Sequence, residues 1–224
     1  MYTYYENGSE GDMKITTVFY DMGNTLLDFH FGKSDDEKDL IGIGHMKDVL
    51  REQLNLVVSQ EELIESFLNP LNDYMINERK QNGYERPFRM HLKQILQGRS
   101  ITDEQELCLA EAFYGEYMRT VKVNEAVFEQ LRSDKRRGMN IGVISNCYMP
   151  AELYRKVFVA CGIDEYVDAY FFSYEQGMMK PNLELFKRAL HYFDVEPRHA
   201  MMVGDSLKAD IEPARSLGME HMRI

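Results

Sequence analysis

The sequence predicts an α/β fold in which a parallel sheet is covered by helices on both faces and an all-helical segment is inserted after the first strand. Two patterns predict it. Short β-branched or aromatic runs alternate with helical patterns in the second half of the chain, which is typical of a parallel sheet between helices. The interval of about residues 35–117 instead repeats its leucines at roughly helical spacing and contains no convincing strand. With 224 residues, the chain has room for both parts.

Four runs are expected to form the sheet, each of them followed by polar residues. They cover residues 15–20, 140–144, 167–172 (the weakest) and 200–203, and helical patterns at 124–137, 150–160 and 182–193 lie between the last three or flank them. A fifth strand is expected to be forming where the chain stops, at residues 222–224. Ligands of parallel sheets bind beyond the carboxyl ends of the strands. The polar residues that follow these runs are therefore the candidate site.

The inserted segment is expected to contain several helices. Breaks are predicted at Asn69-Pro70, Asn82-Gly83 and Arg86-Pro87. Ser59 with Glu62, and Thr102 with Gln105, have the spacing of capping boxes at helix starts. The expected organisation is a loose N-terminal arm at 1–12, an α/β core at 13–30 and 122–224, and a helical cap domain at 31–121.

Composition and charge exclude several classes of protein. The formal net charge is -11, whereas nucleic-acid binders usually carry a basic face. No apolar run has the length of a membrane span, and the N-terminus lacks the basic and apolar regions of a signal peptide. Three cysteines without paired spacing favour a reducing compartment. We therefore expect a cytoplasmic protein without nucleic-acid or membrane partners. A monomer or a homodimer is expected, and the sequence does not distinguish between them.

Four segments carry a resemblance to a known family. They are Phe19-Tyr20-Asp21-Met22-Gly23-Asn24-Thr25-Leu26, then Ser145-Asn146, Lys180-Pro181, and Gly204-Asp205-Ser206-Leu207-Lys208-Ala209-Asp210. In this order, each at a predicted strand end or helix start, they resemble the four motifs of the haloacid dehalogenase superfamily. The resemblance covers residues 13–224 and is closest to subfamily IA, with a helical C1-type cap. It implies a three-layer Rossmann-like core with an inserted all-helical cap domain.

The resemblance also implies the chemistry. Asp21 would be the nucleophile that forms an aspartyl-phosphate, and Lys180 would offset the negative charge of Asp21 and of a phosphate oxygen. Ser145, Asn146 and Thr25 would bind the other phosphate oxygens. Mg²⁺ would be held by Asp21, the carbonyl of Gly23 and Asp205, with Asp210 near its outer shell. Read alone, Asp210 is also consistent with a carboxylate at a helix N-terminus.

The sequence departs from the family pattern at Gly23. Phosphatases of this family usually carry there a second aspartate, which gives a proton to the leaving group and then takes one from water. Losing such a group typically costs about 10²–10⁴ in rate. The predicted function is a magnesium-dependent phosphatase that hydrolyses a small phosphorylated metabolite. A good leaving group, such as a sugar hemiacetal phosphate, would depend less on the missing acid.

Two alternatives stay open. One is a protein with weakened catalysis that binds or regulates a partner, and the other is a dehalogenase or a phosphonatase-type enzyme that cleaves a carbon–halogen or carbon–phosphorus bond.

In the predicted cap, a basic cluster surrounds the Asn82-Gly83 break and consists of Arg79, Lys80, Arg86, Arg89 and Lys93. It is either a solvated helix face balanced by Glu78 and Glu85, or a source of substrate contacts through Arg86 or Arg89. The six histidines show no metal-ligand spacing and are expected to be structural or exposed.

Overall fold

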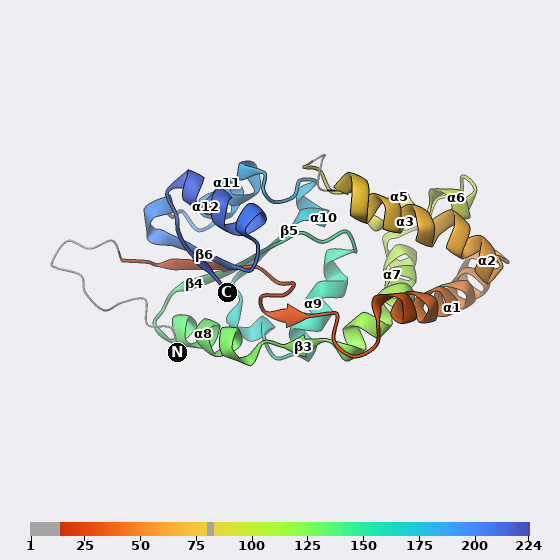
Figure 1. Ribbon diagram of the computed structural model, residues 1–224, viewed down its shortest axis with the longest axis horizontal. Coiled ribbons are helices and arrows are strands. Elements are labelled where there is room, and N and C mark those ends of the chain that lie inside the picture. Colours follow the sequence, from red (N-terminus) through yellow and green to blue (C-terminus); the bar gives the residue numbers. More distant parts are fainter. Residues whose placement is uncertain (1–13, 80–82) are drawn as a thin grey trace.

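A computed structural model describes residues 14–79 and 83–224 (Figure 1). Within them a five-stranded parallel sheet has the order β5-β4-β1-β6-β7. The strands are β1 (Thr17–Tyr20), β4 (Asn140–Ser145), β5 (Ala169–Phe172), β6 (Ala200–Gly204) and β7 (Glu220–Arg223). The four predicted strands and the α/β class are confirmed, and the fifth strand forms at residues 220–223. The arm expected at 1–12 lies outside the described residues.

The central strand β1 sets the position of the site. All four of its residues are buried, and it pairs with β4 on one side and β6 on the other. At its end Tyr20 is level with Val143 of β4 and Val203 of β6. Because the three strands are parallel and end almost level, the residues that follow them meet at one edge of the sheet.

Helices cover both faces of the sheet because side chains alternate along each strand. On one face Val18 and Tyr20 pack in the core that includes α8 (Glu125–Arg136) and α9 (Ala151–Ala160). On the other face Phe19 packs with residues of α11 (Leu183–Tyr192) and α12 (Glu212–Leu217). Figure 1 shows the resulting three layers. The predicted three-layer arrangement is thus confirmed.

The regular elements described between residues 35 and 120 are all helical. They are α1 (Asp35–Leu54), α2 (Gln60–Leu63), the π-helical η1 (Ile64–Leu68), α3 (Asn69–Asp73), the π-helical η2 (Tyr74–Glu78), α5 (Phe88–His91), α6 (Lys93–Leu96) and α7 (Asp103–Thr120). The two longest, α1 and α7, pack along each other. At their crossing, a Cβ on Gly42 would collide with the backbone carbonyl of Phe113, so only glycine permits this approach.

The predicted helix break at Asn69-Pro70 is wrong. The chain stays helical from α2 through η1 into α3, and Asn69 N–H donates to the carbonyl of Ile64 across a π turn. Pro70 lies in the first turn of α3, where the wider π turn before it accommodates a residue without an N–H. The predicted start after Pro87 and the capping box of Thr102 with Gln105 are confirmed.

Two neighbouring connections join the helical segment to the sheet domain. The chain enters the helical segment after β2 (Leu27–Asp28) and returns just before β3 (Lys122–Val123), and these two strands pair antiparallel in a short ribbon. The helical segment extends from this ribbon away from the sheet (Figure 1). Among the described residues, none of the helices combines the length and the apolar character that crossing a bilayer requires.

Candidate active site

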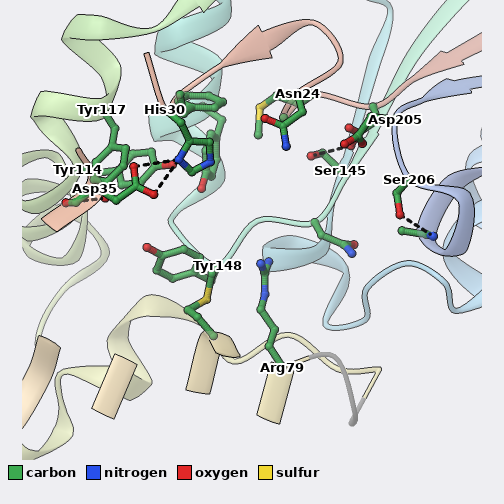
Figure 2. Close-up of a pocket in the computed structure, with 18 of the residues that line it drawn as sticks. Asn24, His30, Asp35, Arg79, Tyr114, Tyr117, Ser145, Tyr148, Asp205 and Ser206 are labelled. Atoms are coloured by element: carbon green, nitrogen blue, oxygen red, sulfur yellow. Dashed lines mark hydrogen bonds and ion pairs between the residues drawn. The ribbon is translucent and has the colours of Figure 1, made fainter. Parts of the chain in front are cut away.

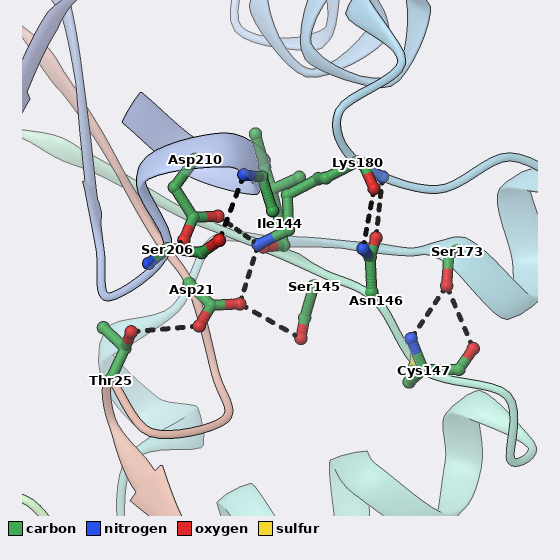
Figure 3. Close-up of polar contacts among 11 residues, drawn as sticks. Asp21, Thr25, Ile144, Ser145, Asn146, Cys147, Ser173, Lys180, Ser206 and Asp210 are labelled. Atoms are coloured by element: carbon green, nitrogen blue, oxygen red, sulfur yellow. Dashed lines mark hydrogen bonds and ion pairs between the residues drawn. The ribbon is translucent and has the colours of Figure 1, made fainter. Parts of the chain in front are cut away.

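The carboxylate of Asp21 lies at the edge of the sheet where β1, β4 and β6 end. Asp21 directly follows β1, and its N–H donates to the carbonyl of Val203 in β6 at 2.9 Å. Its Oδ2 accepts from the hydroxyl of Thr25 at 2.9 Å, and its Oδ1 accepts from Lys180 Nζ at 2.7 Å and from Ser145 Oγ at 3.4 Å (Figure 3). The side chain is buried. These contacts fix its orientation.

Lys180 is the buried cation of this cluster. Besides Asp21, its ammonium donates to the carbonyl of Ile144 at 2.8 Å and to Asp210 Oδ1 at 2.6 Å, so all three of its donors are used. Burial acts to lower the pKa of Lys180, but the two carboxylates outweigh this effect, and the pKa lies above its ordinary value. Lys180 therefore stays protonated.

Asn146 holds Lys180 in place through the main chain. Its Oδ1 accepts from the N–H of Lys180 at 2.7 Å, and its Nδ2 donates to the carbonyl of Lys180 at 2.9 Å (Figure 3). Both ends of the Asn146 amide are thus engaged with the protein. The phosphate contact predicted for Asn146 stays a prediction, and the contacts that its amide makes in the structure hold the main chain of Lys180.

Three carboxylates gather at this edge of the sheet. Asp21, Asp205 and Asp210 each offer an oxygen within 4.8 Å of the others. Burial and the negative charge of Asp21 raise the pKa of Asp205. Burial also raises the pKa of Asp210, against the lowering effect of the Lys180 ammonium. Three acidic groups therefore share one buried ammonium, which leaves an excess of negative charge.

Asp210 is packed against the end of β6. It is almost fully buried, and its Oδ2 accepts from the N–H of Ser206 at 3.0 Å. A Cβ on Gly204 would collide with the Asp210 carboxylate, so the glycine before Asp205 makes room for the fourth motif to fold back on itself. Asp210 thus lies in the first turn of a helix, as the alternative expected, and its buried carboxylate also binds Lys180.

The turn after Asp21 leaves open space at Gly23. Asn24 adopts a left-handed conformation with φ of 59°, and its N–H donates to the carbonyl of Leu27 at 2.8 Å, which closes a tight turn. A Cβ on Gly23 would meet no atom within 4 Å. The position at which related phosphatases carry a carboxylate therefore faces a cavity.

This cavity has a volume of about 670 Å³ and lies between the sheet edge and the helical segment. The predicted residues Asp21, Gly23, Ser145, Asn146, Lys180, Asp205 and Asp210 line one part of it. The rest of the wall was not predicted from the sequence and comes from the cap side and from the segments that follow β4. It includes His30, Asp35, Arg79, Tyr114, Tyr117 and Tyr148 (Figure 2), together with Asp39 and Tyr154. Thr25, another predicted residue, is fully buried and does not line the cavity, but its hydroxyl donates to Asp21.

Arg86 and Arg89 are not among the residues that line this cavity. Arg86 pairs with Glu78 at 2.7 Å and stacks on the ring of Tyr74, and Arg89 pairs with Glu106 and Asp103. The structure thus does not bring these two arginines to the site, because neighbouring acidic residues hold their side chains within the helical segment.

Arg79 reaches the cavity instead. It forms a two-point ion pair with the buried carboxylate of Glu85, at 3.0 and 2.8 Å, and lies beside the ring of Tyr148. Figure 2 shows its side chain rising from the helical segment into the cavity. Lys80 lies outside the described residues. No sequence pattern distinguished Arg79 from the other basic residues of the cluster.

Comparison with known proteins places this chain in a family. Residues 15–218 match the family model of haloacid dehalogenase-like hydrolases. The chain is 33% identical over 134 residues to a phosphoserine phosphatase of Thermus thermophilus, covering 59% of this chain and 53% of that protein. It is 33% identical over 104 residues to a glyceraldehyde 3-phosphate phosphatase of Pyrococcus abyssi, covering 46% and 42%. The chain thus spans about half the length of the curated relatives it matches.

Solved structures agree on the fold. A phosphatase from Thermococcus onnurineus superposes with a TM-score of 0.62 at 21% identity, over 94% of this chain and 86% of that one. A 2-haloacid dehalogenase from Pseudomonas syringae superposes almost equally well, with a TM-score of 0.60 at 20% identity over 93% and 86%. Fold similarity therefore does not separate the two chemistries. The family model and the convergence of the four motifs show that this chain belongs to the haloacid dehalogenase-like hydrolases.

Proposed function

We propose that the protein is a magnesium-dependent phosphomonoesterase that hydrolyses a small phosphorylated metabolite. The observation that carries the proposal is the cluster of Asp21, Asp205 and Asp210, two of which bind the ammonium of Lys180, in the lining of one cavity. Phosphoryl transfer to a carboxylate brings two anions together, so the site must supply positive charge. The names of the matched relatives, a phosphoserine phosphatase and a glyceraldehyde 3-phosphate phosphatase, support the same class of reaction.

In the proposed reaction Asp21 attacks phosphorus, and the bond from phosphorus to the leaving oxygen breaks. Asp21 is suited to this role because Thr25 and Lys180 hold its two oxygens in a fixed orientation before any substrate arrives. Ser145, at 3.4 Å from Asp21, is placed to donate to a phosphate oxygen. Water then attacks the aspartyl-phosphate, which releases inorganic phosphate and regenerates the carboxylate of Asp21.

The residues at the site fit a magnesium ion. Mg²⁺ prefers oxygen ligands, and the described residues offer three neighbouring carboxylates, of which Asp21 and Asp210 pair with the buried ammonium of Lys180. Asp21, Asp205 and the backbone carbonyl of Gly23 would hold the ion, with Asp210 in its outer shell. When bound, Mg²⁺ supplies positive charge against the phosphate oxygens. A dehalogenase needs no such ion, so this acidic cluster favours the phosphatase over that alternative.

We predict that the protein hydrolyses 4-nitrophenyl phosphate in the presence of Mg²⁺ and loses this activity when a chelator is added. Asp205→Asn, which removes one carboxylate charge from the cluster, should raise the Mg²⁺ concentration required for half-maximal activity. Release of nitrophenolate and of inorganic phosphate measures the reaction. A screen of phosphorylated metabolites under the same conditions would then identify the substrate class.

The matched control is Asp194→Asn. Asp194 is exposed and adopts a left-handed conformation that asparagine also tolerates. The activity of the Asp194→Asn variant should therefore depend on Mg²⁺ in the same way as that of the unaltered protein. Activity that is insensitive to chelation would contradict the proposal. Magnesium binding without turnover of any phosphate would instead favour a binding or regulatory protein. The cytoplasmic location and the monomeric or homodimeric state stay predictions from the sequence.

A second prediction concerns Arg79, which we propose contacts an anionic group of the substrate beyond the phosphate being cleaved. Arg79→Gln removes the positive charge but keeps a hydrogen-bond donor for Glu85. For substrates with a second carboxylate or phosphate, KM should rise about 10- to 100-fold, the worth of a charged hydrogen bond. KM for 4-nitrophenyl phosphate should change little. Arg86→Gln, the same change at an arginine that does not line the cavity, should leave both KM values unchanged, and an equal rise in both variants would contradict this role.

A further inference from the structure

The proposed phosphatase reaction leaves two proton transfers without a protein group. An alkoxide leaving group needs a proton as its bond to phosphorus breaks, and the attacking water must later lose one. Glycine at position 23 has no side chain to supply either transfer. The space beside Gly23 is open, so another group that lines the same cavity has room to act there.

His30 is a titratable side chain on the wall of this cavity, and a carboxylate holds its ring. Its Nδ1 lies 2.9 Å from both oxygens of Asp35. An ionised carboxylate can only accept hydrogen bonds, so Nδ1 carries the hydrogen and Nε2 is left to exchange a proton. Figure 2 shows Asp35 on the side of the ring that faces away from Ser145 and Asp205. In this view the other edge of the ring is on the side of Ser145 and Asp205, which line the same cavity.

The local structure fixes both partners. The N–H of His30 donates to Asp28 Oδ1 at 2.9 Å, and Asp28 belongs to the β2–β3 ribbon. Asp35 is the first residue of α1, whose start is set by a capping box in which Ser34 and Glu37 bind each other's backbone N–H groups. A histidine oriented by a carboxylate is an arrangement that enzymes use for general acid–base catalysis.

We propose that His30 is the general acid and base of this enzyme and that Asp35 positions it. This inference rests on the proposed phosphatase function. As Asp21 attacks phosphorus, protonated His30 gives its Nε2 proton to the leaving oxygen, and the alcohol departs. Neutral His30 then takes a proton from water as that water attacks the aspartyl-phosphate. Inorganic phosphate leaves, Asp21 returns to its carboxylate, and His30 is protonated again, so one proton is given and one is recovered in each turnover.

A matched pair of substrates tests this role. 4-Nitrophenolate leaves without a proton, whereas 4-nitrobenzyl phosphate, longer by one methylene, releases an alkoxide that needs one. The ratio kcat/KM reports only the steps up to departure of the leaving group. His30→Gln is therefore expected to lower kcat/KM for 4-nitrobenzyl phosphate about 10²-fold or more and to leave that for 4-nitrophenyl phosphate within about 3-fold. The variant should also release a burst of nitrophenolate equal to the enzyme concentration, because the attack of water has become slow.

Two further variants separate chemistry from folding. His45→Gln changes an exposed histidine that does not line this cavity, and it should leave kcat/KM unchanged for both substrates. Asp35→Asn removes the charge that orients His30, and it should lower kcat/KM for the benzyl substrate alone, by less than His30→Gln. Equal losses on both substrates in His30→Gln, or no loss on either, would overturn the role of His30. Neither result touches the proposed function itself, which is tested by magnesium-dependent turnover of 4-nitrophenyl phosphate in the unaltered protein.

Discussion

Replacing Asp21 by asparagine is expected to reduce phosphatase activity by about 10⁴-fold or more, the scale seen when an enzyme loses its nucleophile. The amide keeps nearly the same shape, and its oxygen can still accept from Lys180 or Thr25. It cannot form the proposed phosphoryl intermediate, because an amide is a far weaker nucleophile than a carboxylate. Phosphate release from 4-nitrophenyl phosphate, measured over several decades of enzyme concentration, provides the necessary range.

The control for this loss is Asp194→Asn, which introduces the same chemical change at an exposed position away from the cavity. Near-normal activity in the control and none in Asp21→Asn would assign the loss to the nucleophile. Thermal unfolding of both variants would check that the fold is retained. Substantial turnover by the asparagine variant would refute the role of Asp21 and with it the proposed reaction.

Replacing Lys180 by methionine is expected to damage both activity and stability. Methionine fills much of the same volume, but it leaves the buried carboxylates of Asp21 and Asp210 facing each other without their cation. Breaking a buried ion pair from one side typically costs on the order of 3–5 kcal/mol in the free energy of unfolding. Denaturant unfolding in the presence of a chelator measures this loss, and phosphate release should fall below detection in the same variant.

The loss should depend on pH. In the unaltered protein burial raises the pKa of Asp210, and the ammonium of Lys180 offsets part of this rise. Without Lys180 the folded-state pKa must rise further, so the folded variant binds a proton more tightly than the unfolded chain. A group with a raised folded pKa contributes stability at low pH that is lost as pH rises. The free energy of unfolding of Lys180→Met should therefore be closest to that of the unaltered protein in acid and furthest below it at neutral pH. Mg²⁺ should recover part of this difference in the free energy of unfolding.

A surface ion pair provides the comparison. Lys135 pairs with Asp168 where both side chains are about one-third exposed, and Lys135→Met should change the free energy of unfolding by about 1 kcal/mol or less. If Lys180→Met were no more destabilising than Lys135→Met, the view of Lys180 as the cation that holds the acidic cluster together would be wrong.

The sequence predicted the sheet and the residues at its edge because both depend on local patterns. A buried apolar run identifies a strand, and parallel strands bring their carboxyl ends together, so the convergence of Asp21, Ser145 and Asp205 follows from strand order. The helix break expected at Asn69-Pro70 failed for a different reason. A proline reads as a helix breaker from its chemistry, while the π turn that accommodates it depends on packing around it.

The cap side of the cavity was harder to predict. Arg79, Arg86 and Arg89 have the same side chain within ten or so positions of one another, and only the acidic residue that each one meets decides which reaches the cavity. His30 was expected to be structural or exposed because it has no metal-ligand spacing, and its side chain is indeed exposed, although it also lines the cavity. Its contact with Asp35 depends on the path between β2 and α1. The spacing of Ser34 and Glu37 marks the start of α1, but nothing in the sequence shows where the ring of His30 points.

The short ribbon formed by β2 and β3 has a consequence for how such a protein can diversify. Since the chain leaves and re-enters the sheet domain at neighbouring points, the closure entropy that the sheet domain experiences grows only with the logarithm of the length between them. Residues can be added, removed or exchanged beyond the ribbon at little energetic penalty to the sheet domain, in which Asp21 follows β1 and Lys180 precedes α11. Selection for a new metabolite can therefore act on residues beyond the ribbon while Asp21, Lys180 and Asp205 stay in place in the sheet domain.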